Sequence, residues 1–123
     1  MGKRVLLVED EKNVILGVRT CLDAVGYDVE IVEDGGEALD AVRREHPDLI
    51  LLDLLMPRVD GFEVLKVLKG KEDTSKIPII VLTAKAEEED KQRAMDLGAD
   101  SYMTKPFKPQ ELWDTLKYYL PEA

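Results

Sequence analysis

The sequence contains very little cysteine or histidine and has no long hydrophobic run. Cys21 is the only cysteine among 123 residues, so an internal disulfide is excluded and nothing favours an oxidising compartment. The only histidine, His46, is expected at a solvated helix end, where the helix dipole favours it. No apolar run approaches the roughly 18–20 residues that cross a bilayer, and the N-terminus, which soon becomes acidic, does not resemble a signal peptide.

Positive charge is also scarce. The 26 acidic residues outnumber the 17 basic ones and give a net charge of −9. A chain this acidic is repelled by phosphate backbones and by anionic membrane surfaces. We therefore expect this domain to make no direct contact with nucleic acid or with membranes, and to be a cytoplasmic protein.

What the sequence does contain is a repeated alternation of strands and helices. Five short apolar runs predict strands over residues 5–8, 29–32, 49–52, 79–82 and 101–103. Continuous runs of Val, Ile and Leu are typical of parallel strands that are covered on both faces. The second run is interrupted by Glu30, and this alternation favours a place nearer the edge of the sheet.

Helical periodicity separates these runs. After the first run, an apolar stripe at spacings of three and four residues predicts a helix that ends at Gly26. The stripe consists of Val14, Val18, Cys21, Leu22 and Val25. Two capping boxes are predicted to open the second and third helices: Asp34 with Glu37, and Asp60 with Glu63.

The last two helices have their own boundary signals. The segment EEEDKQRAMDL places acids in a first turn, where the dipole favours them, and Gly98 ends that helix. Pro109 suits the first turn of the final helix. The inner face of that helix is predicted to consist of Leu112, Leu116, Tyr119 and Leu120. Five β–α units predict a single α/β domain over residues 1–123, with a doubly wound, five-stranded parallel sheet in the order 2-1-3-4-5 and helices on both faces.

Polar side chains follow the carboxyl ends of these strands. Glu9 and Asp10 come directly after the first run, and Asp53 comes directly after the third. Because these strands are neighbours in the predicted order and ligands of an open α/β sheet lie outside this edge, the three carboxylates are expected to converge. Thr83 ends the fourth strand and Lys105 follows the fifth, which adds a hydroxyl and an ammonium group to the same rim.

This set of residues predicts a chemistry. Clustered carboxylates require a cation, and hard oxygen ligands beside a phosphate are what Mg²⁺ prefers. Such a site suits phosphoryl transfer onto Asp53 to form an acyl phosphate, with the metal and Lys105 neutralising charge and Thr83 hydrogen-bonding the product. Each residue also has an ordinary alternative: Asp10 as a helix cap, Thr83 as a β-branched strand residue and Lys105 as a solvated loop lysine. A chance meeting of all of them at one rim is much rarer.

Four segments of the sequence resemble the receiver domain of response regulators in two-component signalling. They are LLVEDE, DLILLDLLMPRVDGFEVL, PIIVLTAKA and GADSYMTKPF, and the resemblance runs from Val5 to about Leu120. It implies a cytoplasmic phosphoprotein that accepts a phosphoryl group from a histidine kinase or a phosphotransfer protein. It also implies a signalling switch and not an enzyme, since only self-phosphorylation and slow autodephosphorylation would be catalysed. The switch would control a downstream target protein or an output domain that is not in this chain.

The resemblance assigns a role to each residue of the acidic site. Asp53 would be the phosphoacceptor, and Lys105 would contact the phosphoryl group. The implied cofactor is Mg²⁺, with Mn²⁺ able to take its place. Asp10 and Asp53 would bind the metal directly, together with the backbone carbonyl of Leu55. Glu9 would act through a water molecule.

The resemblance also predicts a conformational switch. Thr83 would contact the phosphoryl group, and its inward movement would vacate space for the ring of Tyr102, which occupies the switch-aromatic position of the family. The face formed by the fourth helix, the fifth strand and the fifth helix would then move. Tyr102, Trp113 and Tyr118 are candidates for an aromatic partner surface on this face. Scattered surface aromatics remain the alternative, as does a packing role for Tyr102.

Some positions depart from the family pattern. Glu9 stands where many relatives have Asp, and its longer arm should still reach a metal-bound water. Leu55 and Lys85 flank the path of an attacking water without a group to orient it, which predicts a long-lived phosphoryl state. Ser101 and Thr115 stand where the transcription-factor branch of the family has an acid and an arginine that serve dimerisation, so we expect a monomer or a weak dimer. The sequence ends directly after the last helix, which favours a stand-alone receiver over one excised from a longer regulator.

Three other classes of protein share the architecture or the chemistry. A phosphohydrolase of the haloacid-dehalogenase kind has a second Asp two residues after its nucleophile, where this chain has Leu55 and therefore no general acid. A flavodoxin-like electron carrier needs a phosphate-binding loop rich in Ser and Thr after the first strand, where this chain has EDEKN. A degenerate receiver that binds partners without phosphorylation is disfavoured by the complete set of site residues.

Overall fold

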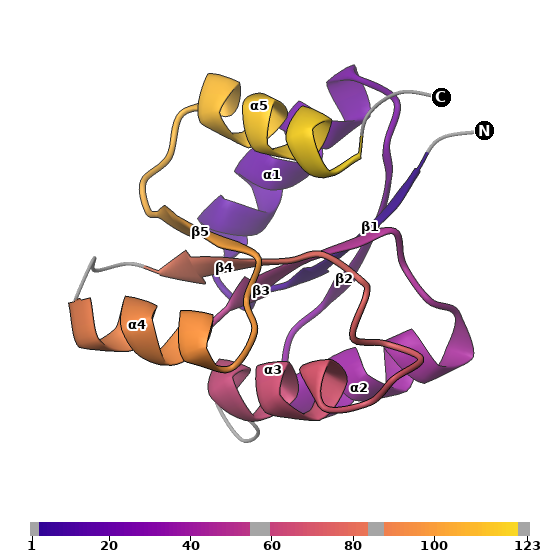
Figure 1. Cartoon of the computed structure of the whole chain (residues 1–123). Coiled ribbons are helices and arrows are strands. Elements are labelled where there is room, and N and C mark those ends of the chain that lie inside the picture. The colour runs from indigo at the N-terminus through magenta and orange to yellow at the C-terminus, as the bar shows by residue number, and fades with distance from the viewer. Residues whose placement is uncertain (1–2, 55–59, 84–87, 121–123) are drawn as a thin grey trace.

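The computed structural model describes residues 3–54, 60–83 and 88–120 and contains a five-stranded sheet (Figure 1). Its strands are β1 Arg4–Val8, β2 Asp28–Val32, β3 Leu49–Asp53, β4 Ile79–Thr83 and β5 Ser101–Thr104. All neighbouring strands are parallel, and their order is β2-β1-β3-β4-β5. The predicted doubly wound α/β fold and its strand order are therefore confirmed.

Helices cover both faces of the sheet. They are α1 Lys12–Ala24, α2 Gly35–Arg44, α3 Gly61–Lys69, α4 Glu88–Asp96 and α5 Pro109–Tyr119. In Figure 1, α1 and α5 lie above the sheet, and α2, α3 and α4 lie below it. None of the helices in the described ranges is both long and apolar enough to cross a membrane. The strand order reverses between β1 and β3, which places the ligand-binding edge of an open α/β sheet at the carboxyl ends of these two strands.

Alternating side chains of the strands divide the core into two layers. Toward α1 and α5, Leu7 and Leu51 pack in one cluster with Leu112. Toward α2, α3 and α4, Leu52 and Val81 belong to the second cluster. Every residue of β3 and β4 is buried, which explains why their sequences are apolar up to the last residue, Asp53 in β3 and Thr83 in β4. Each fully buried large side chain contributes about 1.5–3 kcal/mol to folding.

The predicted starts of α2 and α3 are confirmed. Asp34 Oδ1 accepts a hydrogen bond from Glu37 N at 2.8 Å, and Asp60 Oδ1 accepts one from Glu63 N at 2.9 Å. Each bond satisfies a backbone N–H of the first turn, which has no partner within the helix. At α2 the Glu37 carboxylate accepts a hydrogen bond from Glu33 N at 3.0 Å. In a reciprocal capping box it would accept from the backbone N–H of the N-cap residue, which is Asp34.

The structure corrects one expectation for α1 and excludes one alternative. Val25 follows the helix and is 48% exposed, so the buried stripe consists of Val18 and Leu22 without it. The chain turns at this point because Gly26 adopts a φ of +84°, which glycine reaches without steric cost. The residue that precedes α1 is Glu11, so Asp10 is not the helix cap.

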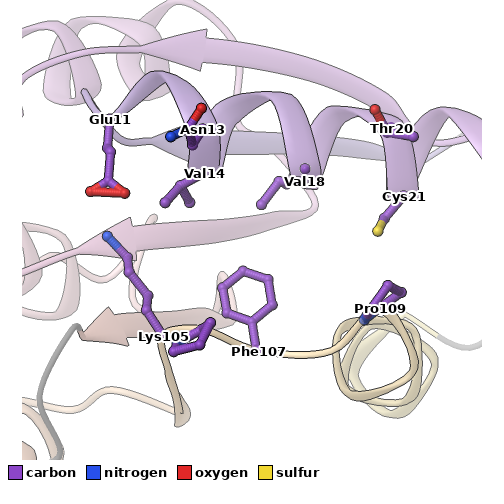
Figure 2. Close-up of a pocket in the computed structure, with 11 residues that line it drawn as sticks. Glu11, Asn13, Val14, Val18, Thr20, Cys21, Lys105, Phe107 and Pro109 are labelled. Carbon is purple, nitrogen blue, oxygen red and sulfur yellow. The ribbon is translucent and has the colours of Figure 1, made fainter.

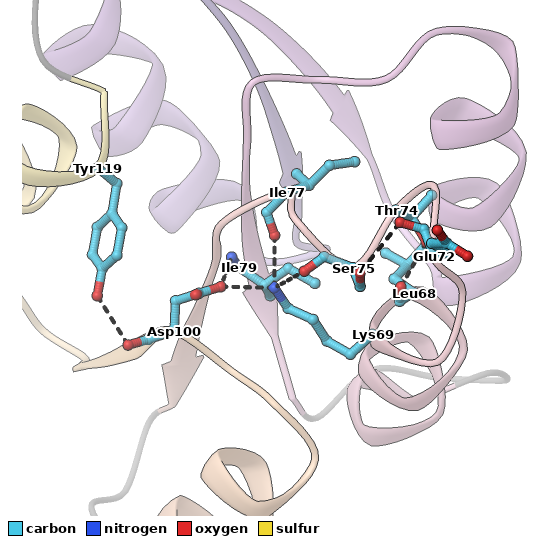
Figure 3. A network of polar contacts seen from close by, with 9 residues as sticks. All are labelled: Leu68, Lys69, Glu72, Thr74, Ser75, Ile77, Ile79, Asp100 and Tyr119. Carbon is cyan, nitrogen blue, oxygen red and sulfur yellow. Dashed lines mark hydrogen bonds and ion pairs between the residues drawn. The ribbon is translucent and has the colours of Figure 1, made fainter.

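A polar network joins α3 to the beginnings of β4 and β5 (Figure 3). Lys69 Nζ donates to the carbonyl oxygens of Ser75 and Ile77 at 2.9 and 2.8 Å, and to Asp100 Oδ2 at 2.9 Å. The same Asp100 oxygen accepts from Ile79 N at 2.8 Å. These contacts fix the amino-terminal ends of two strands, at the edge of the sheet opposite to the one where the acidic residues gather.

Candidate functional site

Three carboxylates converge at the carboxyl ends of β1 and β3. Glu9 and Asp10 follow β1 and Asp53 ends β3, and one oxygen atom from each lies within 4.8 Å of the other two. The sheet itself brings them together, because Val8 is paired with Leu52 in the register of β1 and β3. Glu9 is 0% exposed and Asp53 is 5% exposed, whereas Asp10 is open to solvent.

Lys105 adds a positive charge to this acidic cluster. Its Nζ lies 2.7 Å from Glu9 Oε1 and 3.5 Å from Asp53 Oδ2. Its backbone N–H donates to the Thr83 carbonyl at 2.7 Å, which continues the pairing of β4 and β5 and fixes the start of the β5–α5 connection beside the site. The lysine side chain is largely buried, so both ion pairs are mostly removed from solvent.

Carboxyl groups outnumber ammonium groups in the described part of this cluster. Among the described residues, the carboxyl groups of Glu9, Asp10 and Asp53 gather around the ammonium group of Lys105. Like charges at this separation repel each other more strongly where burial excludes water, and the Lys105 ammonium group offsets part of that repulsion. The available donors are hard carboxylate oxygens, one of them exposed to solvent, which are the ligands that Mg²⁺ prefers. The residues present therefore fit a divalent cation.

Thr83 lies at the same edge of the sheet, with its side chain on the opposite face from Asp53. Along β4, Ile79 and Val81 point into the layer of α2, α3 and α4, and strand alternation places Thr83 on that side as well. Along β3, Leu51 points toward α1 and α5, and alternation places Asp53 with it. Thr83 is buried. Asp53 and Thr83 therefore lie on opposite faces of the sheet at the carboxyl ends of neighbouring strands.

Tyr102 lies on the same side of the sheet as Thr83. The register of β4 and β5 pairs Val81 with Tyr102 and Thr83 with Thr104, so the two side chains are two register positions apart on neighbouring strands. The Tyr102 side chain is 40% exposed. Lys91 Nζ, from α4, lies 4.5 Å from the centroid of its ring. The ring is therefore in contact with α4 and accessible to solvent.

The three predicted partner-surface aromatics differ in their exposure to solvent. Tyr102 and Tyr118 are exposed, Tyr118 the more strongly at 78%. Trp113 is half-buried, and its indole N–H donates to the Cys21 carbonyl of α1 at 3.0 Å. Residues five apart on a helix are separated by roughly 140°, so Trp113 joins α5 to α1 while Tyr118 faces solvent. A partner surface that includes all three aromatic residues stays a prediction.

Two positions named in the sequence lie outside the described residues. Leu55 is the predicted carbonyl ligand of the metal, and Lys85 was expected to flank the path of an attacking water together with it. The third metal ligand and the long-lived phosphoryl state therefore stay predictions.

Gly61 supports the site, although no pattern in the sequence singled it out. It is the first residue of α3, and its N–H donates to the Leu54 carbonyl at 3.0 Å. A Cβ atom built on Gly61 would lie 2.5 Å from the Asp53 carbonyl oxygen and 2.5 Å from Leu54 Cα. The sequence shows only that a glycine directly follows the Asp60 cap. The first position of a helix ordinarily accepts many residue types, so this glycine did not by itself indicate a close contact with the site.

An apolar groove begins at Lys105 and runs between α1 and the β5–α5 connection (Figure 2). Its volume is about 700 Å³, and Val14, Val18 and Phe107 are among the residues that line it. Figure 2 shows Lys105 pointing across this space toward Glu11. A partner that occupies the groove would therefore lie next to the acidic cluster.

Comparison with known proteins identifies the family of the chain. The family model described as "Response regulator receiver domain" matches residues 5–117. The chain belongs to this family, and it is a receiver domain of a two-component response regulator, a class of signalling switches.

Curated relatives of the chain are longer proteins. The alkaline phosphatase synthesis transcriptional regulatory protein PhoP of Bacillus subtilis is 46% identical over 112 residues, which cover 91% of this chain and 46% of that protein. The response regulator MprA of Mycobacterium tuberculosis is 43% identical over 112 residues, which cover 91% of this chain and 48% of that protein. The chain therefore spans about half the length of the curated relatives it matches.

Solved structures match the chain over nearly its full length. The receiver domain of the sensor histidine kinase PA1611 from Pseudomonas aeruginosa PAO1 has a TM-score of 0.91 and 33% identity, covering 99% of this chain and 100% of that one. It is described with a magnesium ion coordinated in the active site cleft. The chemotaxis protein CheY4 of Vibrio cholerae has a TM-score of 0.90 and 34% identity, covering 98% of this chain and 100% of that one.

Proposed function

We propose that Asp53 is the phosphoacceptor of this receiver domain, and that residues 1–123 form one such domain. The proposal rests on one observation: the buried Asp53 carboxylate lies within 4.8 Å of oxygens of Glu9 and Asp10, and 3.5 Å from the Lys105 ammonium group. A carboxylate in this position is a nucleophile whose surroundings stabilise the charge that an incoming phosphoryl group carries.

The phosphoryl donor in this proposal is a phosphohistidine of a histidine kinase or of a phosphotransfer protein. An Asp53 oxygen attacks the phosphorus atom, the P–N bond breaks, and the imidazole nitrogen keeps the electron pair of that bond. Lys105 neutralises charge on the phosphoryl oxygens, and the Thr83 hydroxyl donates a hydrogen bond to one of them. The product is an acyl phosphate on Asp53.

Four residues are proposed to hold Mg²⁺: Asp10 and Asp53 directly, Leu55 through its carbonyl, and Glu9 through a water molecule. When bound, the ion neutralises negative charge on the transferring group. The cluster of hard oxygen donors supports this assignment, as does the magnesium ion described for the PA1611 receiver domain. Mn²⁺ is expected to take its place, since it also accepts carboxylate, carbonyl and water ligands.

Phosphorylation is proposed to act on the surface formed by α4, β5 and α5. Thr83 and Tyr102 share the α4 side of the sheet, so a Thr83 hydroxyl drawn toward the phosphoryl group leaves room for the Tyr102 ring. The altered surface then controls a downstream protein or an output domain. In this role the receiver binds and releases partners and turns over no external substrate.

In a longer regulator that contained this domain, signalling and DNA binding would belong to different segments of the chain. The name of the PhoP relative describes a transcriptional regulator, but the matched segment covers 46% of that protein. We propose that the present domain makes no direct contact with nucleic acid, because its net charge of −9 repels phosphate backbones. DNA binding in such a regulator would then belong to residues outside this segment.

Intact-mass measurement after incubation with a small acyl phosphate tests the proposed phosphorylation. The wild type should gain one phosphoryl group in the presence of Mg²⁺ and none in the presence of a chelator. Asp53→Asn should gain none under either condition, whereas Asp73→Asn, an exposed aspartate of the α3–β4 connection, should behave as the wild type. An adduct on Asp53→Asn as abundant as that on the wild type would overturn the proposal.

A further inference from the structure

Helix α4 has few apolar side chains with which to hold its place. Its sequence is EEDKQRAMD, and Ala94 is the only buried side chain among those described, while Met95 is 39% exposed. The preceding helix, α3, is of the same length and buries five residues: Gly61, Phe62, Val64, Leu65 and Leu68. Contacts other than apolar burial must therefore contribute to the position of α4.

Two cation–π contacts connect α4 to its neighbours on either side. The Arg93 guanidinium carbon lies 4.0 Å from the centroid of the Phe62 ring of α3. Lys91 Nζ lies 4.5 Å from the centroid of the Tyr102 ring of β5. Both distances are within the roughly 6 Å over which a cation and an aromatic face attract each other.

The two aromatic rings differ in their freedom to move. Phe62 is 7% exposed and packs in the core cluster on this side of the sheet, so the Arg93 contact is made with a fixed ring. Tyr102 is 40% exposed, so its ring can leave Lys91 without opening a core cavity. The Arg93 contact is therefore made with a ring packed in the core, and the Lys91 contact with a ring that is free of it.

We propose that Lys91 is a positioning residue that holds the Tyr102 ring in its outward position, and that release of this contact is a step of the switch. This inference rests on the proposed function, in which Tyr102 moves after phosphorylation of Asp53. The contact exists only while the ring is outward, so its loss shifts the balance toward the inward position. A cation–π contact at an exposed site has a strength that corresponds to a shift of about two- to fivefold in that balance.

Lys91→Met tests the proposal, because it keeps the length of the side chain and removes its charge. Lys91→Arg keeps the cation and is the rescue variant, and Lys117→Met, at an exposed lysine of α5, controls for net charge. The readout is the NMR resonance of the Tyr102 ring in protein with ¹³C-labelled tyrosine, assigned by its loss in Tyr102→Phe.

The expected result is specific to the charge at position 91. In Lys91→Met the Tyr102 resonance should move toward its position in the phosphorylated wild type, and the acyl phosphate concentration for half-maximal phosphorylation should fall about two- to fivefold. Lys91→Arg and Lys117→Met should retain the wild-type resonance. An unmoved resonance in Lys91→Met, or an equal movement in Lys91→Arg, would overturn the inference.

Arg93→Met separates the contact from a general loosening of the helix. Loss of the Arg93 contact with Phe62 should raise the rate of amide hydrogen exchange in α4 relative to α3 and leave the Tyr102 resonance unchanged. A Tyr102 shift as large as that of Lys91→Met would contradict a specific role for Lys91. Failure of the proposed function is a different result: the wild type then gains no phosphoryl group, while a Tyr102 resonance that moves in Lys91→Met and stays in place in Lys91→Arg still shows that the lysine cation holds the ring.

Discussion

The α carbon of Gly61 packs so closely against the end of β3 that a Cβ atom on it would lie 2.5 Å from the Asp53 carbonyl oxygen. A hydrogen bond of 3.0 Å from Gly61 N to the Leu54 carbonyl reinforces this contact. The first turn of α3 and the proposed phosphoacceptor are therefore in direct backbone contact. The position of Asp53 depends on a helix whose first residue has no side chain.

Gly61→Ala should destabilise the fold and disturb the site together, because α3 or β3 must move to admit the methyl group. Overpacking of this kind costs about 1–3 kcal/mol, and we expect the free energy of unfolding in urea to fall by that amount and the affinity for Mg²⁺ to fall with it. Gly17→Ala is the control: a Cβ atom there has open space, so alanine should stabilise α1 by about 0.5–1 kcal/mol. Wild-type stability and Mg²⁺ affinity in Gly61→Ala would contradict the argument.

Asp10→Asn should have opposite effects with and without metal. In the presence of a chelator the variant should melt at a higher temperature than the wild type, because one of three mutually repelling carboxylates has been removed. Added Mg²⁺ should stabilise the wild type, by about 2.7 kcal/mol at a concentration one hundred times the dissociation constant, and should stabilise the variant far less. Thermal unfolding with and without Mg²⁺ measures both effects. Equal stabilisation of the two proteins by Mg²⁺ would show that Asp10 is not a ligand.

Lys69→Met should weaken the fold without affecting the site. The Lys69 side chain is 11% exposed, and its loss removes one of the two donors to the Asp100 carboxylate and the Lys69 donor to two backbone carbonyls. Hydrogen bonds to charged groups are worth about 1.5–3 kcal/mol each, so a loss of about 3 kcal/mol in urea denaturation is expected. Lys66→Met, at an exposed lysine of the same helix, should change stability by less than about 0.5 kcal/mol. Folded Lys69→Met should be phosphorylated as the wild type is, since the network lies at the edge of the sheet opposite to the acidic cluster.

Glu30 is expected to give the stability a defined dependence on pH. The hydrogen bond from Arg4, at 2.5 Å, and that from Arg44, at 3.2 Å, hold the pKa of the Glu30 carboxyl below its usual value of 4.5. The folded state therefore binds this proton less readily than the unfolded state. The resulting stabilisation is present above the unfolded pKa and is lost as the pH falls through the folded pKa.

Glu30→Gln should accordingly lose about 0.5–1 kcal/mol of stability at pH 7, the usual range for a partly exposed ion pair. The difference from the wild type should shrink as the pH falls below 4.5. Urea denaturation of both proteins at several pH values measures this difference. A difference that stays constant with pH would show that the Arg4 and Arg44 contacts do not depend on the charge of Glu30.

The strand order and the convergence of the acidic residues could be predicted from the sequence. Continuous apolar runs identify buried parallel strands, and the register of such a sheet then determines which strand ends are neighbours. Glu9, Asp10 and Asp53 follow neighbouring strands and meet for that reason. Lys105 joins them because the β5–α5 connection begins beside Thr83.

Features that depend on tertiary packing could not be predicted in the same way. The close approach of Gly61 to Asp53 involves two backbones, and no side-chain pattern records it. Helical periodicity shows that Trp113 lies off the inner stripe of α5 but not which neighbouring helix it meets. Its hydrogen bond to the Cys21 carbonyl shows that this helix is α1. The Lys91 contact with Tyr102 likewise depends on how α4 lies against β5.

Borohydride reduction of the phosphorylated protein, followed by tandem mass spectrometry of its peptides, tests most directly whether the carboxylate cluster makes Asp53 the phosphoacceptor. Borohydride reduces an acyl phosphate to an alcohol, so a phosphorylated aspartate is detected as homoserine. We predict homoserine at position 53 alone, formed after incubation with an acyl phosphate and Mg²⁺ and absent when a chelator replaces the metal. Homoserine in place of Asp10, or at position 53 in equal amounts without metal, would contradict this prediction.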